Sequence, residues 1–113
     1  MKITNLRNNA ILADRVKIAH TFWGRLVGLL NRQSLETGEA LVLKPSNSIH
    51  TLFMRFAIDA IFLDNKGRVI AVLPSLKPFR VSPIYFNASL TIELPEGMLK
   101  SSQTKIGDII TII

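Results

Sequence analysis

The sequence predicts a mainly β fold: a compact antiparallel β-barrel or sandwich with one short helix near residues 21–30 and a helical turn near residues 96–101. Three observations predict it. Short apolar segments of strand length recur along the chain, separated by turn-forming residues. Only residues 21–30 place apolar side chains convincingly at helical spacing. The four residues 64–67, Asp-Asn-Lys-Gly, are a strong hairpin signal.

Three strands are expected in the first half of the chain. Residues 2–6 form a short first strand, and the Asn-Asn pair after it favours a turn, since Asn tolerates the left-handed conformation. Residues 11–18 form the second strand. Residues 39–43 are apolar and strand-like, and the strand must end or lie at an edge by Pro45, which has no N–H to donate.

The predicted helix over residues 21–30 begins at Thr21, a good N-cap residue. Gly24 and Gly28 each weaken a helix by about 1 kcal/mol relative to Ala, so we expect packing to stabilise it. Its apolar stripe comprises Phe22, Leu26, Leu29 and Leu30, with Trp23 and Val27 on a neighbouring stripe.

A hairpin is predicted at the centre of the fold. Residues 58–63 are apolar on both faces except for Asp59, which indicates a strand buried on two sides. Residues 64–67 form the turn, and residues 68–73 return, again apolar on both faces. We therefore expect these two strands to be the antiparallel centre.

The last third of the chain predicts a loop, a strand, a helical turn and a final strand. Residues 74–83 hold three prolines and form the loop, with Phe79 as an anchor onto the core. Residues 88–94 alternate between apolar and polar, which places three side chains outward: Ser89, Thr91 and Glu93. Residues 96–101 form the helical turn and residues 109–113 the last strand.

Composition narrows the functional classes. A chain of 113 residues without internal repeats predicts a single domain, residues 1–113, and no apolar run approaches the ~18 residues that span a bilayer. The N-terminus lacks the apolar core of a signal peptide, so as the chain stands we expect a cytoplasmic location, although a removed leader would not be visible. The absence of cysteine excludes disulfides and thiolate chemistry.

The chain is basic, with a net charge of +6 and a pI near 10.2. An anionic partner such as nucleic acid is one explanation. The fourteen cations are scattered without a run, however, which favours a solvated basic surface. Trp23 and most phenylalanines fall within apolar patterns and are expected to be buried, so single-stranded nucleic-acid binding is an alternative that we do not favour.

Residues 48–67 concentrate polar groups in the most apolar part of the chain. We predict a polar pocket of His50, Arg55 and Asp59, with Met54 and Phe53 as its apolar wall. A buried Asp59 needs hydrogen-bond donors, which either Arg55 or backbone N–H groups of a crossing loop could supply. In that case both residues pin the hairpin instead. The binding candidates are His50, Met54, Arg55 and Asp59.

Enzymatic and metal hypotheses have less support. Ser48 and His50 are two residues apart and could form a hydrolase with Asp59, but no Gly-x-Ser-x-Gly elbow is present. His20, His50 and Asp59 lack the short spacing of metal ligands. We therefore name no catalytic residue, no metal ligand and no cofactor. The sequence favours a non-enzymatic binding or interaction module, with an unknown small molecule or a protein as partner.

Several segments carry a family likeness over nearly the whole chain: residues 28–32, 48–59, 62–64, 67–69, 93–97 and 107–108. On these residues the chain resembles the small bacterial and archaeal family known as domain of unknown function 192. The resemblance implies a closed, mainly antiparallel β fold with a short helix across one end, and no assigned activity. The chain has Ser46 where related sequences often have cysteine, and Ala57 where they usually have proline, so any role for a thiol there is lost.

Overall fold

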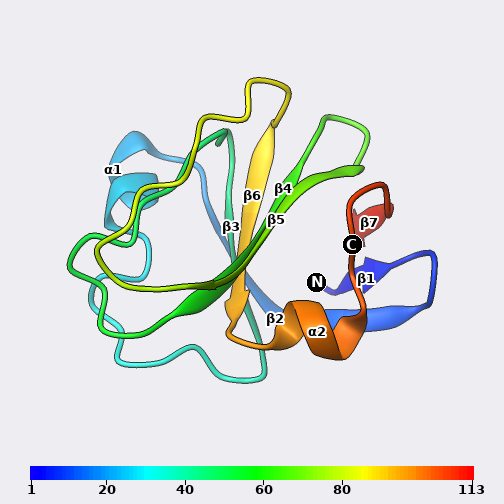
Figure 1. Cartoon of the computed structure of the whole chain (residues 1–113), viewed down its shortest axis with the longest axis horizontal. Coiled ribbons are helices and arrows are strands. Elements are labelled where there is room, and N and C mark those ends of the chain that lie inside the picture. The colour runs from blue at the N-terminus through cyan, green and yellow to red at the C-terminus, as the bar shows by residue number, and fades with distance from the viewer.

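One curled sheet of seven strands forms the protein (Figure 1). The computed structural model describes the backbone of residues 1–113 and all side chains except those of Phe22, Trp23 and Leu26. The mainly β prediction is confirmed. The strands are β1 (Ile3–Asn5), β2 (Ala10–Ala19), β3 (Gly38–Leu43), β4 (Ile58–Leu63), β5 (Val69–Leu76), β6 (Leu90–Pro95) and β7 (Ile110–Ile112). The helices are α1 (Phe22–Val27) and α2 (Met98–Ser102).

The order of strands across the sheet is β5-β4-β6-β3-β2-β1-β7. All pairs are antiparallel except β2 and β3, which run parallel. The predicted antiparallel arrangement is thus confirmed for every strand pair but this one. The connection from β2 to β3 contains α1, and a crossover of that kind lets the second strand start again at the same end as the first.

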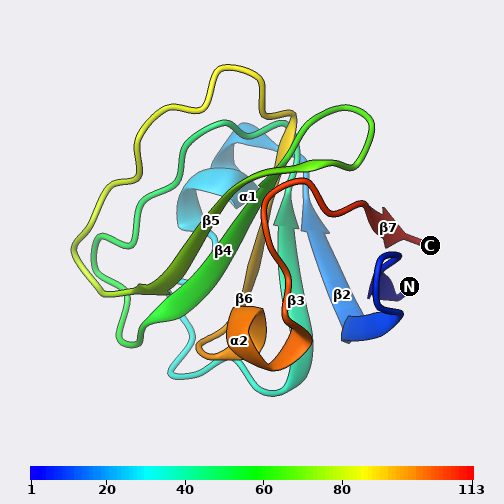
Figure 2. The same cartoon turned by 45° about the vertical axis from the view of Figure 1, so that its right-hand side comes forward.

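The two ends of the sheet approach each other, so the sheet curls into an incomplete barrel (Figure 2). Arg68 and Ile109 form an isolated antiparallel bridge, and the N–H of Val69 donates to the carbonyl of Asp108 at 2.8 Å. The β4–β5 hairpin therefore lies at one end of the strand order rather than at its centre. Of these two strands, β4 has a neighbouring strand on each side and β5 has one neighbour, which corrects the prediction that both are central.

Apolar side chains pack on both faces of the sheet. One cluster, inside the curl, contains Ile61, Ile92 and Leu99 of α2. The second cluster, on the other face, contains Phe62 and the Leu29 side chain that follows α1. All six residues of β4 are buried, which confirms the prediction of a strand covered on two sides.

Helix α1 begins where the sequence predicts and ends earlier. The hydroxyl of Thr21 accepts from the N–H of Gly24 at 2.8 Å, as expected of an N-cap. The helix stops at Gly28, whose φ of +51° is outside the helical range. Leu29 and Leu30 lie beyond it. The predicted roles of Phe22, Trp23 and Leu26 concern side chains outside the described ones.

The loop predicted over residues 74–83 is shorter, because β5 continues to Leu76. Proline is tolerated there because β5 lies at one end of the strand order. On its outer side no neighbouring strand needs a hydrogen bond from the backbone nitrogen of Pro74. Phe79 is 57% exposed and has a φ of +62°, so the prediction that it anchors onto the core is wrong. No helix of the described chain is long and apolar enough to cross a membrane.

Candidate functional site

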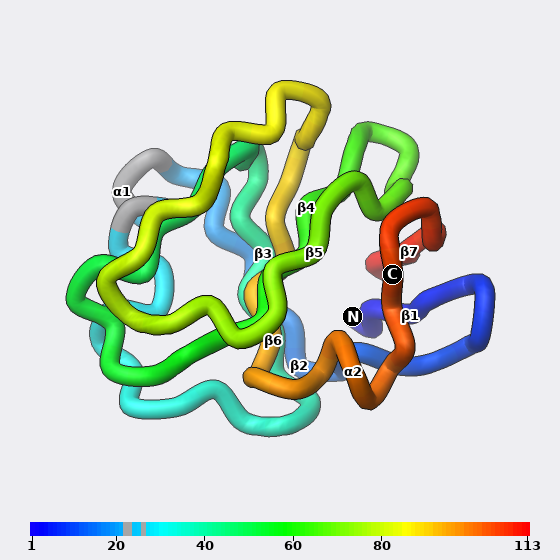
Figure 3. The backbone as a smooth tube through the Cα atoms, in the orientation of Figure 1, coloured from blue at the N-terminus to red at the C-terminus, as the bar shows by residue number. Residues whose placement is uncertain are grey.

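Two long loops, residues 44–57 and 77–89, run side by side at one end of the sheet (Figure 3). Thr51, which is fully buried, joins them. Its hydroxyl donates to the carbonyl of Lys77 at 2.6 Å and accepts from the N–H of Arg80 at 2.9 Å. Its own N–H donates to the carbonyl of Arg80 at 2.8 Å. These bonds hold the first loop in one position over the sheet.

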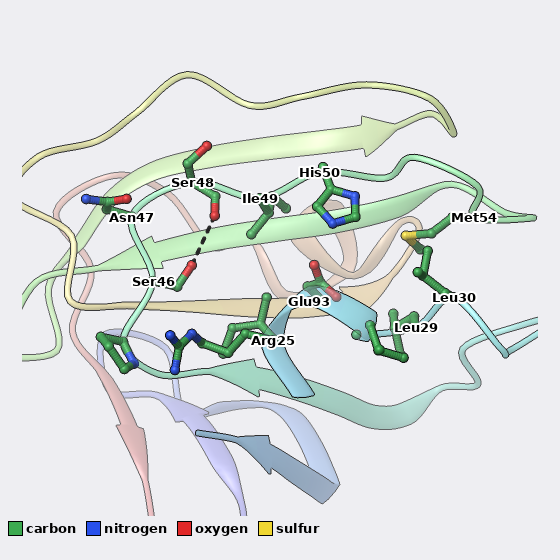
Figure 4. Close-up of a pocket in the computed structure, with 14 residues that line it drawn as sticks. Arg25, Leu29, Leu30, Ser46, Asn47, Ser48, Ile49, His50, Met54 and Glu93 are labelled. Atoms are coloured by element: carbon green, nitrogen blue, oxygen red, sulfur yellow. Dashed lines mark hydrogen bonds between the residues drawn. The ribbon is translucent and has the colours of Figure 1, made fainter. Parts of the chain in front are cut away.

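A cavity of about 240 Å³ lies under the first loop, against α1 and the residues that follow it. Figure 4 shows its lining side chains, which come from four separate parts of the chain. They are Arg25, Val27, Gly28, Leu29, Leu30, Leu43, Pro45, Ser46, Asn47, Ser48, Ile49, His50, Met54 and Glu93. We call this cavity the Glu93 pocket.

Glu93 is the unusual member of the pocket. It lies on β6 between Leu41 of β3 and Ala60 of β4, and only 3% of its surface is exposed. Within the described residues, no hydrogen bond or ion pair reaches its carboxylate. Burial alone raises the pKa of the carboxyl to about 8. At neutral pH most molecules therefore carry a neutral carboxylic acid, which can donate as well as accept a hydrogen bond.

The sequence pattern placed Glu93 outward, and the structure corrects this. Leu94 and Ile92 do face the inner cluster, as the alternation predicts. Thr91 and Glu93, however, are buried on the opposite face, because α1 and the first loop cover it. The only sign in the sequence was indirect: Glu93 begins one of the segments that carry the family resemblance.

His50 and Met54, two of the four predicted binding residues, line the Glu93 pocket. The Nδ1 atom of His50 accepts from the N–H of Leu52 at 3.2 Å, which fixes the ring orientation. Figure 4 shows the imidazole pointing into the pocket toward the Glu93 carboxyl. Met54 is 4% exposed and contributes an apolar wall. A basic and an acidic group thus face one small cavity.

The other two predicted residues lie elsewhere. Asp59 is buried and accepts from three backbone N–H groups: those of Ser75 at 2.9 Å, Gly97 at 3.1 Å and Leu99 at 2.8 Å. Arg55 is exposed and makes no ion pair with it. Arg55 and backbone N–H groups were the two predicted sources of hydrogen-bond donors for Asp59, and in the structure backbone N–H groups supply them. Neither residue lines the Glu93 pocket. Their predicted role in binding stays a prediction.

The hydrolase geometry is not present. The Ser48 hydroxyl contacts the carbonyl and the hydroxyl of Ser82, each at 3.2 Å. In Figure 4 it points away from the His50 imidazole. Asp59, engaged by backbone donors, does not orient His50. Among the described residues, no three His, Cys, Asp or Glu side chains are grouped as metal ligands would be.

The prediction that most phenylalanines are buried is wrong for three of them: Phe53 is 73% exposed, Phe79 57% and Phe86 84%. Phe53, predicted as part of the apolar wall, does not line the Glu93 pocket. Phe53 and Phe79 come from the two loops, and their rings meet edge to face with centroids 5.6 Å apart. Lys77 and Arg80 are exposed on the same loop as Phe79. The two loops therefore present apolar rings beside positive charge, outside the Glu93 pocket.

Comparison with known proteins identifies the family. The model of the family described as "Uncharacterized ACR", domain of unknown function 192, matches residues 3–112. The chain belongs to this family. Its family relatives include UPF0127 proteins of Pyrococcus horikoshii, 36% identical with 94% of each chain covered, and Pyrococcus furiosus, 34% identical with 92% of this chain and 91% of that protein covered.

A solved structure has the same fold as this protein. It is that of a protein of unknown function from Novosphingobium aromaticivorans, with a TM-score of 0.85 at 19% identity, covering 98% of this chain and 82% of that one. The family match over residues 3–112 confirms the predicted resemblance over nearly the whole chain. Ser46, where the chain departs from the family pattern, lines the Glu93 pocket and bonds to the Thr91 hydroxyl at 2.8 Å.

Proposed function

We propose that this protein is a small-molecule-binding domain and that the Glu93 pocket is its binding site. The observation that carries the proposal is the Glu93 carboxyl: its side chain lines the cavity, the residue is only 3% exposed, and no hydrogen bond or ion pair from a described residue reaches it. Burying a polar group without a hydrogen bond costs several kcal/mol. A ligand that donates to Glu93 would recover part of that free energy, so the pocket has a reason to bind one.

The rest of the pocket suits a small polar ligand. Ser46 and His50 add polar atoms to the lining beside Glu93, and Met54 and Leu43 add apolar surface. A few polar groups among apolar walls are typical of ligand sites. The volume of about 240 Å³ corresponds to about eight water molecules at ~30 Å³ each, so the ligand has on the order of eight non-hydrogen atoms.

The test is a nuclear magnetic resonance titration of the amide signals. The probes are L-alanine, ethylamine, propionate, 1,2-propanediol and glycerol, added one at a time. We expect saturable shifts at residues 46–50 and 93 with at least one probe. Glu93→Leu removes the polar group and should abolish them. Glu96→Gln, an exposed acid three residues further along, should leave them unchanged. Absence of saturable shifts with all five probes would refute the proposal.

A second candidate function is single-stranded nucleic-acid binding, which the exposed pair of Phe53 and Phe79 favours. Bases stack on aromatic rings, and neighbouring cations such as Lys77 and Arg80 contact phosphates. The test is fluorescence anisotropy with a labelled oligothymidylate of about twelve nucleotides. Binding should weaken steeply with salt and with the double change of Phe53 and Phe79 to Ser. No binding at low salt would exclude this function.

A further inference from the structure

A basic side chain, Arg25, and an acidic one, Glu93, line the Glu93 pocket without forming an ion pair with each other. The ion pairs among described residues are Arg7–Asp108, Arg15–Asp14 and Arg32–Glu39, so neither Arg25 nor Glu93 takes part in one. Figure 4 draws the Arg25 guanidinium below Ser46 and the Glu93 carboxyl below His50, so the two groups lie apart along the pocket lining.

From this arrangement we infer that the ligand is a small zwitterion, with an ammonium group that meets Glu93 and a carboxylate that meets Arg25. An α-amino acid with a small side chain is the simplest member of this class. The inference rests on the proposed function, because it names the ligand class of the same pocket.

The Glu93 end suits an ammonium group. A charged donor beside a buried carboxyl stabilises its ionised form and so lowers its pKa. Since burial keeps the pKa of free Glu93 near 8, ammonium binding at pH 7 expels a proton from the carboxyl. The other ionisable groups lining the pocket are His50 and Arg25, and the strands that flank Glu93 place Leu41 and Ala60 beside it. A hydroxyl ligand, in contrast, would bind the neutral acid and release no proton.

The Arg25 end suits a carboxylate. The Nη1 atom of Arg25 donates to the carbonyl of His20 at 2.6 Å, which holds the side chain in place. A guanidinium carries five N–H donors in a planar fork that matches a carboxylate. A held guanidinium loses little conformational entropy when a carboxylate binds. The side chain is half-buried, so its attraction for an anion is only partly screened by solvent.

Size restricts the class further. Both charges of the ligand must fit, with the atoms that join them, into about 240 Å³. A molecule with one charged group would leave either Arg25 or Glu93 without a partner inside the pocket. Affinity for a zwitterion should therefore exceed the affinity for either half alone.

The experiment is isothermal titration calorimetry at pH 7 with L-alanine, ethylamine, propionate and 1,2-propanediol. We expect L-alanine to bind at least about tenfold more tightly than the other three, a difference of about 1.4 kcal/mol. Comparing buffers of different ionisation enthalpy should show close to one proton released on binding of L-alanine. Glu93→Gln should abolish this release and weaken L-alanine about tenfold while sparing propionate. Arg25→Gln should weaken L-alanine and spare ethylamine.

Glu96→Gln and Arg55→Gln, two exposed residues outside the pocket, serve as controls and should bind as the unmodified protein does. If 1,2-propanediol binds as tightly as L-alanine without proton release, the ligand class is wrong while the pocket remains a binding site. If ethylamine alone binds, the Arg25 half of the inference is wrong. If none of these four probes binds, and glycerol also causes no saturable shifts in the magnetic resonance titration, the proposed function fails with the inference.

Discussion

Asp59→Ala should destabilise the protein strongly, although Asp59 makes no ion pair with Arg55. Its two carboxylate oxygens accept from the backbone N–H groups of three residues on two other elements: Ser75 in β5, Gly97 before α2 and Leu99 within α2. The side chain therefore ties β4 to its neighbour β5 and to the helix that covers the inner core. Truncation to Ala removes all three acceptor contacts at once.

The magnitude follows from those contacts. A hydrogen bond to a charged group contributes about 1.5–3 kcal/mol, so three give an upper range of about 5–9 kcal/mol. Ser75 and Gly97 are exposed residues, and water can replace the acceptor of their N–H groups in the variant. The N–H of Leu99 is buried and would remain unsatisfied. We therefore expect a loss of about 3–5 kcal/mol, most of it from Leu99 and its neighbours.

The assay is equilibrium unfolding in urea, followed by circular dichroism. Asp59→Ala should lower the free energy of unfolding by about 3–5 kcal/mol, with a fall in Tm on the order of 15 °C. Arg55→Ala is the matched control and should change stability by less than about 0.5 kcal/mol, because Arg55 is exposed. A loss below about 1 kcal/mol for Asp59→Ala, at an unchanged denaturant slope, would refute the assigned backbone contacts.

Three further predictions concern pH and backbone geometry. The pKa of Glu93 is raised from 4.5 to about 8, so the native state holds a proton that the unfolded chain loses; stability should fall as pH rises between these values, and Glu93→Gln should remove that fall in urea titrations. The hydrogen bond from Arg7 lowers the pKa of Asp108, whose contribution is therefore present above about pH 4 and lost below it; Asp108→Asn should lower stability at pH 7 and flatten the acid limb of thermal unfolding. A Cβ on Gly67 would lie 2.7 Å from the carbonyl oxygen of Ile110 at a φ of +81°, whereas one on Gly107 meets nothing within 4 Å at +96°. Gly67→Ala should therefore lower Tm by clearly more than Gly107→Ala, which bears only the left-handed penalty of about 1–2 kcal/mol.

Much of the fold could be predicted from local patterns. The period-two alternation, the Asp-Asn-Lys-Gly turn and the Thr21 cap act between neighbouring residues, and each appears where expected. The parallel pairing of β2 with β3 could not be predicted in this way. It depends on which strands meet after a crossover, and on contacts between residues far apart in the sequence.

The candidate site was half predictable for the same reason. His50 and Met54 belong to one short segment, and their clustering in an apolar context was visible in the sequence. Glu93 was not, because the alternation in β6 says which residues share a face and nothing about what covers that face. A polar residue in such a pattern is expected to face water. Here the face of β6 that carries Glu93 is covered by the loop of residues 44–57, which Thr51 holds in place. The usual inference from polarity to exposure therefore fails.

The surroundings of Glu93 also bear on why an acidic residue occupies this buried position. A leucine at this position would avoid the cost of a buried carboxyl, and its neighbours Leu41 and Leu43 would accept an apolar side chain. Asp59 and Asp108, the other buried acids, each have several donors and serve the fold. Glu93 has none from the described residues and weakens the fold as pH rises. The proposed ligand would account for a residue that lowers stability while it faces a cavity beside a histidine and an arginine.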